Sequence, residues 1–129
     1  MNKIICLTDY KNHFGSKWMA SPYRSGLDKD YLKRLFREAG HEVNYLNMCQ
    51  VNWNDPAWKN QIVLYTSSEE YGLHHKSFIE DVVFGLKELG AILLPDPVFL
   101  RANNNKVFME ILRKTKLPVA LQSIEAMVF

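Results

Sequence analysis

Two polar stretches carry most of the side chains that could bind a ligand or take part in chemistry. Residues 9–26 combine a carboxylate, phenols, an imidazole and several cations, including Asp9, Tyr10 and Lys17. Cationic groups of this kind could meet a carboxylate or a phosphate, which favours a substrate-binding loop. The stretch SSEEYGLHH, residues 67–75, offers hydroxyls, carboxylates and two adjacent imidazoles that could hydrogen-bond a polar ligand.

Both stretches also have purely structural interpretations. Residues 9–26 could be a solvated loop whose aromatic rings pack at a sheet edge, and Ser and Glu are common in the first turn of a helix. His74 and His75 are neighbours and would face apart on a helix, which argues against a metal site. A Ser–His catalytic pair needs a third, orienting group, and none is evident. The sequence therefore predicts no catalytic residue and no metal ligand, and it leaves Ser67, Ser68 and Glu69 undecided.

A third feature is NNNK, residues 103–106, which precedes an apolar helical pattern. Asparagine is among the preferred N-cap residues, so a helix is expected to begin near this point. A cation at a helix N-terminus is disfavoured by the helix dipole. A nearby anionic phosphate would offset that cost, which makes Lys106 a candidate phosphate-binding residue.

Apolar runs at residues 3–8, 43–46, 62–66 and 91–95 predict strands, and helical patterns separate them. Asp28 and Gly40 should bound the first helix, Gly90 should end the second, and Gly85 inside the second indicates close packing. Residues 47–60 are predicted as a loop with one helical turn, and residues 119–122 as a further strand.

This alternation predicts a single α/β domain over residues 1–129, built as a three-layer, Rossmann-like open parallel sheet. About 4–5 strands are expected, in the order 2-1-3-4. Ligands of such sheets bind beyond the carboxyl ends of the strands where the chain reverses direction, here after Thr8 and Thr66.

Composition excludes several classes of function. The net charge of +2 is too balanced to predict binding to nucleic acid or to a membrane surface. No segment has the length of a transmembrane helix, and neither GxGxxG nor a P-loop motif follows a predicted strand. The two cysteines, Cys6 and Cys49, lack metal-ligand spacing and indicate a reduced, cytoplasmic protein.

The segment YTSSEEYGLHHKSFIEDVVFGLKELGAILLPDPVFLRANNNKVFMEILRK resembles the N-terminal region of ATP-grasp carboxylate–amine ligases. That family begins with a Rossmann-like pre-ATP-grasp domain, followed by a helix opened by a short polar motif that ends in lysine. The resemblance rests on the order of the elements and on NNNK. It implies that Lys106 contacts nucleotide phosphate, and that the loops after the first and third strands hold a small carboxylate or amine substrate. The implied substrate-binding residues are Asp9, Tyr10, Lys17, Ser67, Ser68, Glu69 and Tyr71.

For the complete enzyme, the resemblance implies ATP and Mg²⁺ as cofactors and carboxylate activation through an acyl phosphate. The ATP-binding lobes need about 200 further residues, so this chain alone is expected to be inactive and to need no cofactor. The apolar ending ALQSIEAMVF, residues 120–129, is interpreted as a cut within a larger protein. It also favours self-association, a homodimer included. The alternative is a self-standing Rossmann-like binding or dimerisation module, and a small enzyme using Ser67 or His74 ranks last.

Overall fold

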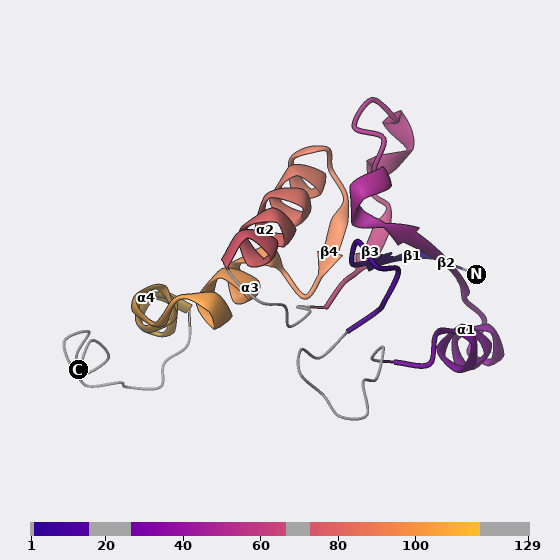
Figure 1. Ribbon diagram of the computed structural model, residues 1–129, viewed down its shortest axis with the longest axis horizontal. Helices are drawn as coiled ribbons and strands as arrows, with labels where there is room; N and C mark the ends of the chain where they lie inside the picture. The colour runs from indigo at the N-terminus through magenta and orange to yellow at the C-terminus, as the bar shows by residue number, and fades with distance from the viewer. Residues whose placement is uncertain (1, 16–26, 67–72, 117–129) are drawn as a thin grey trace. The chain divides into compact units, whose positions relative to one another are not determined.

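The computed structural model describes residues 2–15, 27–66 and 73–116 (Figure 1). The chain divides into two units, residues 1–95 and residues 96–129. Whether the two form the single domain expected from the sequence stays a prediction.

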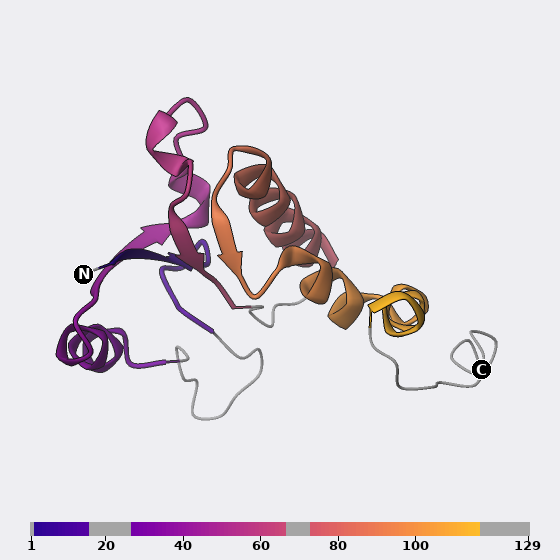
Figure 2. The same cartoon turned by 180° about the vertical axis from the view of Figure 1, so that it is seen from behind.

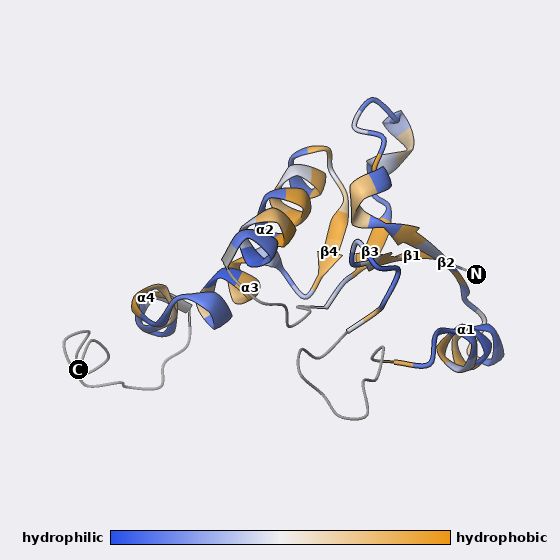
Figure 3. Cartoon of the chain, viewed as in Figure 1, coloured by the Kyte–Doolittle hydropathy of each residue, from blue (hydrophilic) through white to orange (hydrophobic). Residues whose placement is uncertain are grey.

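A four-stranded parallel sheet forms the first unit. Its strands are β1 (Lys3–Thr8), β2 (Glu42–Asn47), β3 (Ile62–Leu64) and β4 (Ile92–Leu94), in the order β2-β1-β3-β4. The predicted α/β class, parallel direction and strand order are therefore confirmed. Figure 3 shows the strands as largely hydrophobic, which is typical of a parallel sheet buried between layers.

Helix α1 (Lys29–Glu38) covers one face of this sheet. The Asp28 side chain accepts a hydrogen bond from the Tyr31 backbone N–H at 3.0 Å, and Gly40 ends the helix with a φ of 87°. Leu32 and Phe36 pack against a core of sheet and loop residues. That core consists of Ile4, Cys6, Phe14 and Val43.

Helix α2 (Leu73–Glu88) lies on the other side of the sheet from α1, as Figures 1 and 2 show. Its apolar side is buried, as are Val63 and Leu93 in the strands. Gly90 follows the helix, as expected, and has a φ of 92°. The buried side of α2 consists of Ile79, Val82, Val83 and Leu86.

The connection from β2 to β3 holds two 3₁₀ turns, η1 (Met48–Gln50) and η2 (Pro56–Trp58), where one helical turn was expected. The connection also explains Gly85. A Cβ atom on Gly85 would lie 2.8 Å from the indole of Trp53, so the predicted close packing at this glycine is confirmed.

The second unit contains α3 (Pro97–Asn104) and α4 (Lys106–Lys116). Helix α3 was not predicted, although Asp96 caps it through the Val98 N–H at 3.1 Å and proline occupies its first position. The Asn105 side chain accepts from the Phe108 N–H at 3.0 Å, so the predicted asparagine-capped helix is confirmed. The further strand expected at residues 119–122 lies outside the described residues.

Candidate functional site

The backbone that follows β1 is organised by Asp9, which is 2% exposed. Its Oδ1 atom accepts hydrogen bonds from the backbone N–H groups of Lys11 and His13, both at 2.9 Å. The Asp9 N–H in turn donates to the His13 carbonyl at 2.9 Å, and Asn12 adopts a positive φ of 65°. Asp9 therefore closes a tight turn at the carboxyl end of the strand.

Asn47, the last residue of β2, holds this turn against the neighbouring strand. Its Nδ2 donates to the Tyr10 carbonyl at 3.1 Å and to Asn12 Oδ1 at 2.9 Å. Its Oδ1 accepts from the Cys49 N–H at 2.9 Å. Sequence reasoning missed Asn47, because its partner Asn12 lies 35 positions away along the chain.

The same loop also reaches the end of β3. A Cβ atom on Gly15 would lie 3.5 Å from Thr66 Oγ1, and the φ of Gly15 is 80°. The segments that follow β1 and β3 are thus neighbours, as the order β2-β1-β3-β4 requires. This is the position at which open parallel sheets bind their ligands.

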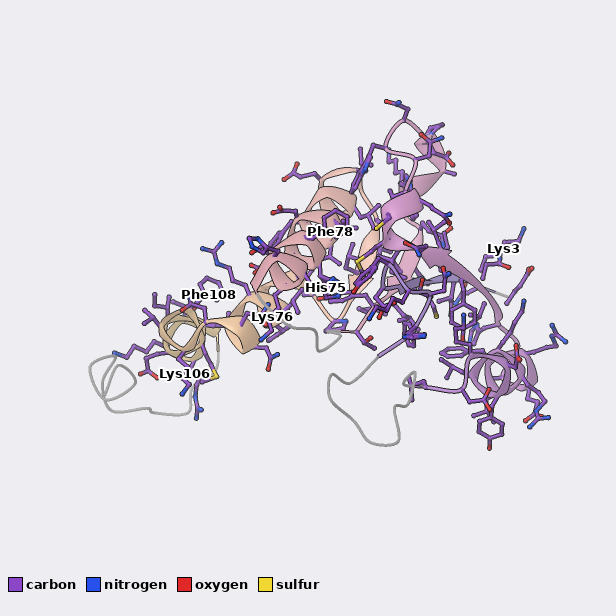
Figure 4. The ribbon with its side chains drawn as sticks, viewed as in Figure 1. Lys3, His75, Lys76, Phe78, Lys106 and Phe108 are labelled. Carbon is purple, nitrogen blue, oxygen red and sulfur yellow. The ribbon has the colours of Figure 1, made fainter. Side chains whose placement is uncertain are left out.

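Three side chains contact one another at this end of the sheet. The Tyr10 and His75 rings are 5.4 Å apart at an interplanar angle of 70°, and Lys11 Nζ lies 5.4 Å from the Tyr10 centroid. His75 Nε2 is buried and has no hydrogen-bond partner among residues 2–15, 27–66 and 73–116. Figure 4 places His75 in the first turn of α2, whereas His74 is exposed. No role was expected for His75 from the sequence, because adjacent histidines face apart on a helix.

Two lysines lie at the turn beside the Asp9 carboxylate. Lys29 Nζ donates to the Asn12 carbonyl at 2.8 Å, and Lys11 lies over Tyr10. The Asp9 carboxylate is already engaged with two backbone N–H groups. The turn therefore offers both cationic and hydrogen-bonding groups to a polar ligand.

The Cys6 thiol of β1 and the Tyr45 phenol of β2 stay protonated near neutral pH. Burial raises the pKa of the Cys6 thiol to about 11. The pKa of Tyr45 rises to about 12, chiefly through burial, with added repulsion from Cys6, Asp30 and Asp28. The Tyr45 hydroxyl donates to the Lys29 carbonyl at 2.8 Å, so it anchors the start of α1. In the described parts of the chain, no three His, Cys, Asp or Glu side chains are grouped as a metal site would require.

The predicted site residues divide into three groups. Asp9 and Tyr10 lie at the strand ends, as their assignment requires. Lys106 is the first residue of α4, is exposed and belongs to the second unit (Figure 4). The other five lie outside the described residues, and they are Lys17, Ser67, Ser68, Glu69 and Tyr71.

Comparisons of the chain with family models, with curated proteins and with solved structures gave no match. Among residues 2–15, 27–66 and 73–116, no helix combines the length and apolar character that a membrane crossing requires.

Proposed function

We propose that the chain is the cytoplasmic, substrate-side domain of an ATP-grasp-type ligase and has no ligase activity alone. The observation that carries the proposal is the parallel sheet in the order β2-β1-β3-β4, with a polar turn at the carboxyl ends of its strands. Helix α4 adds support, because an exposed lysine opens it directly after an asparagine cap.

The residues of this chain would bind and orient the substrates. The turn after β1 would hold a small carboxylate or amine, with the backbone fixed by Asp9 and Asn47. Lys106 fits a nucleotide phosphate, because it adds a point charge to the positive end of a helix. ATP with Mg²⁺ supplies the phosphoryl group that activates the carboxylate. Residues outside this sequence would hold the metal and the remainder of ATP.

Calorimetry with ATP and Mg²⁺ tests the proposal on the 129-residue chain. The expected result is no binding tighter than about 1 mM, because a single lysine does not replace the nucleotide lobes. Submillimolar affinity would contradict the assignment of those lobes to residues outside this sequence.

A second test uses a protein extended by the ATP-grasp lobes. Lys106→Ala should weaken ATP binding while changing the free energy of unfolding by less than about 0.5 kcal/mol, as is usual for an exposed site. Lys3→Ala is the matched control, because it removes the same charge at the amino end of β1 (Figure 4). Equal ATP affinity in the two variants would end the phosphate assignment.

One observation favours the second candidate, a self-standing binding or dimerisation module. Ile92 and Leu94 of β4 are 46% and 49% exposed, although parallel sheets are normally covered on both faces. An exposed apolar surface of this kind is suited to a protein partner, a second copy of the chain included.

A further inference from the structure

His75 presents a buried nitrogen atom that no described residue of the chain hydrogen-bonds. Its Nε2 atom is shielded from solvent and unpaired, although buried polar atoms in folded proteins are almost always hydrogen-bonded. The ring belongs to the first unit, as do β1 and the turn that follows it. The unpaired nitrogen therefore lies where the strand order predicts a ligand.

Tyr10 is the side chain that contacts His75 at this position. The edge-to-face contact joins a partly buried imidazole to a phenol ring that is 46% exposed. The backbone of Tyr10 is held separately, because its carbonyl accepts from Asn47 and the turn is closed by Asp9. The backbone position of Tyr10 is consequently fixed by contacts other than the one between its ring and His75.

Two lysines near this contact could meet an anionic group. Lys11 lies on the ring of Tyr10, and the ammonium group of Lys29 is fixed on the Asn12 carbonyl of the same turn. A group that replaced the Tyr10 ring would meet the ammonium of Lys11 and the imidazole nitrogen of His75. Charge-assisted hydrogen bonds to such donors are short and comparatively strong.

We propose that His75 Nε2 binds an oxyanion of the ligand, and that the Tyr10 ring turns aside to admit it. The oxyanion is a carboxylate or a phosphate, since both offer the same acceptor oxygens. The inference rests on the strand-end ligand site of the proposed function, but it does not depend on the ATP chemistry.

The test is an NMR titration of the isotope-labelled 129-residue chain with sodium succinate and, separately, with sodium phosphate. Sodium chloride at matched ionic strength serves as the reference. The side-chain resonances of Tyr10 and His75 should shift in a saturable way with at least one of the two probes. The probe that binds more tightly identifies the source of the oxyanion as a carboxylate or a phosphate.

Two variants should change the affinity in opposite directions. His75→Phe keeps a ring beside Tyr10 but lacks the nitrogen, so the affinity should fall by about tenfold. Tyr10→Ala removes the competing ring and should tighten binding by about threefold, the factor that corresponds to an ordinary aromatic pair. His74→Phe, which alters the exposed neighbour, should bind like the original chain.

Equal affinity in His75→Phe and His74→Phe would overturn the role of His75, and so would the absence of saturable shifts with either probe. Weaker binding in Tyr10→Ala would overturn the displacement of the ring. These results are separable from the ligase proposal, because that proposal is tested by ATP binding and by Lys106. Loss of the Lys106 effect with retained oxyanion binding would remove the ligase assignment and leave this inference standing.

Discussion

Asp9 follows β1, where the sequence predicts a ligand-binding residue, but its carboxylate hydrogen-bonds the backbone of the turn. Its Oδ1 atom accepts from two backbone N–H groups. Its substitution should therefore disturb the turn before it affects any ligand.

Asp9→Ala should lower the free energy of unfolding by about 2 kcal/mol, because it leaves two N–H groups without their acceptor. Asp9→Asn retains an Oδ1 acceptor and should cost clearly less. Urea unfolding followed by circular dichroism gives both values. Equal losses in the two variants would show that the charge, and not the acceptor geometry, holds the turn.

Because of Cys6, the free energy of unfolding should fall as the pH becomes alkaline. Burial raises the pKa of its thiol from 9.0 to about 11. Between these values the unfolded chain loses a proton that the folded chain keeps, so stability is complete below pH 9 and falls as pH rises toward 11. The loss is on the order of 2 kcal/mol at its full extent.

The comparison that isolates this effect is Cys6→Ala, studied by urea unfolding at pH 8, 9, 10 and 11. The original chain should lose more stability over this range than the variant. Tyr45, whose pKa is raised to about 12, acts in both proteins at the upper end of the range. Parallel curves for the two proteins would show that Cys6 is not the source.

At the scale of elements, Gly85 of α2 lies directly against Trp53 of the β2–β3 connection. A methyl group on Gly85 would lie 2.8 Å from the indole, whose ring is 43% exposed and therefore able to move. Gly85→Ala thus combines a gain in helix propensity of about 1 kcal/mol with the cost of displacing Trp53.

A double-mutant cycle separates these two terms. In the Trp53→Ala background, Gly85→Ala should stabilise the chain by about 1 kcal/mol, whereas in the original chain the gain should be absent or reversed. Urea unfolding of the four proteins gives the coupling energy. Identical effects in the two backgrounds would mean that displacing the Trp53 indole costs no free energy.

The elements that the sequence predicted are those with local signals. Asp28 and Gly40 bound α1, Gly90 follows α2, and Asn105 caps α4, and each acts through residues within a few positions. Helix α3 was missed because an eight-residue helix after Asp96 and Pro97 has too few turns for an apolar period to be clear. The contacts of the site were missed for a different reason. Asn47 meets Asn12 across 35 positions, and no local pattern encodes such a pair.

At the scale of the first unit, the two faces of the sheet are covered unequally. Parallel register places Ile4, Ile62 and Ile92 in one row on the face of α1, and Leu94 lies in the next row on that face. Ile4 is 6% exposed and Ile92 is 46% exposed, so the burial of these side chains decreases along the row from β1 to β4. On the opposite face, Leu93 of the same strand is only 6% exposed.

This uncovered part of the sheet predicts self-association of the free chain. Leu94→Lys places a charge on the exposed face and should shift sedimentation toward the monomer. Because the side chain is already 49% exposed, the free energy of unfolding should change by less than about 1 kcal/mol. Leu27→Lys is the matched control, since Leu27 is 51% exposed but precedes α1 and belongs to none of the four strands.

Analytical ultracentrifugation over a range of protein concentrations measures the effect. The original chain and Leu27→Lys should associate alike, and Leu94→Lys should need a higher concentration to do so. If all three proteins stayed monomeric, the dimerisation alternative would fail. Ile92 and Leu94 would then be left for a different protein segment to cover, as the ligase proposal allows. If Leu27→Lys and Leu94→Lys weakened association equally, the loss would follow from added charge alone, and the uncovered sheet would not be the interface.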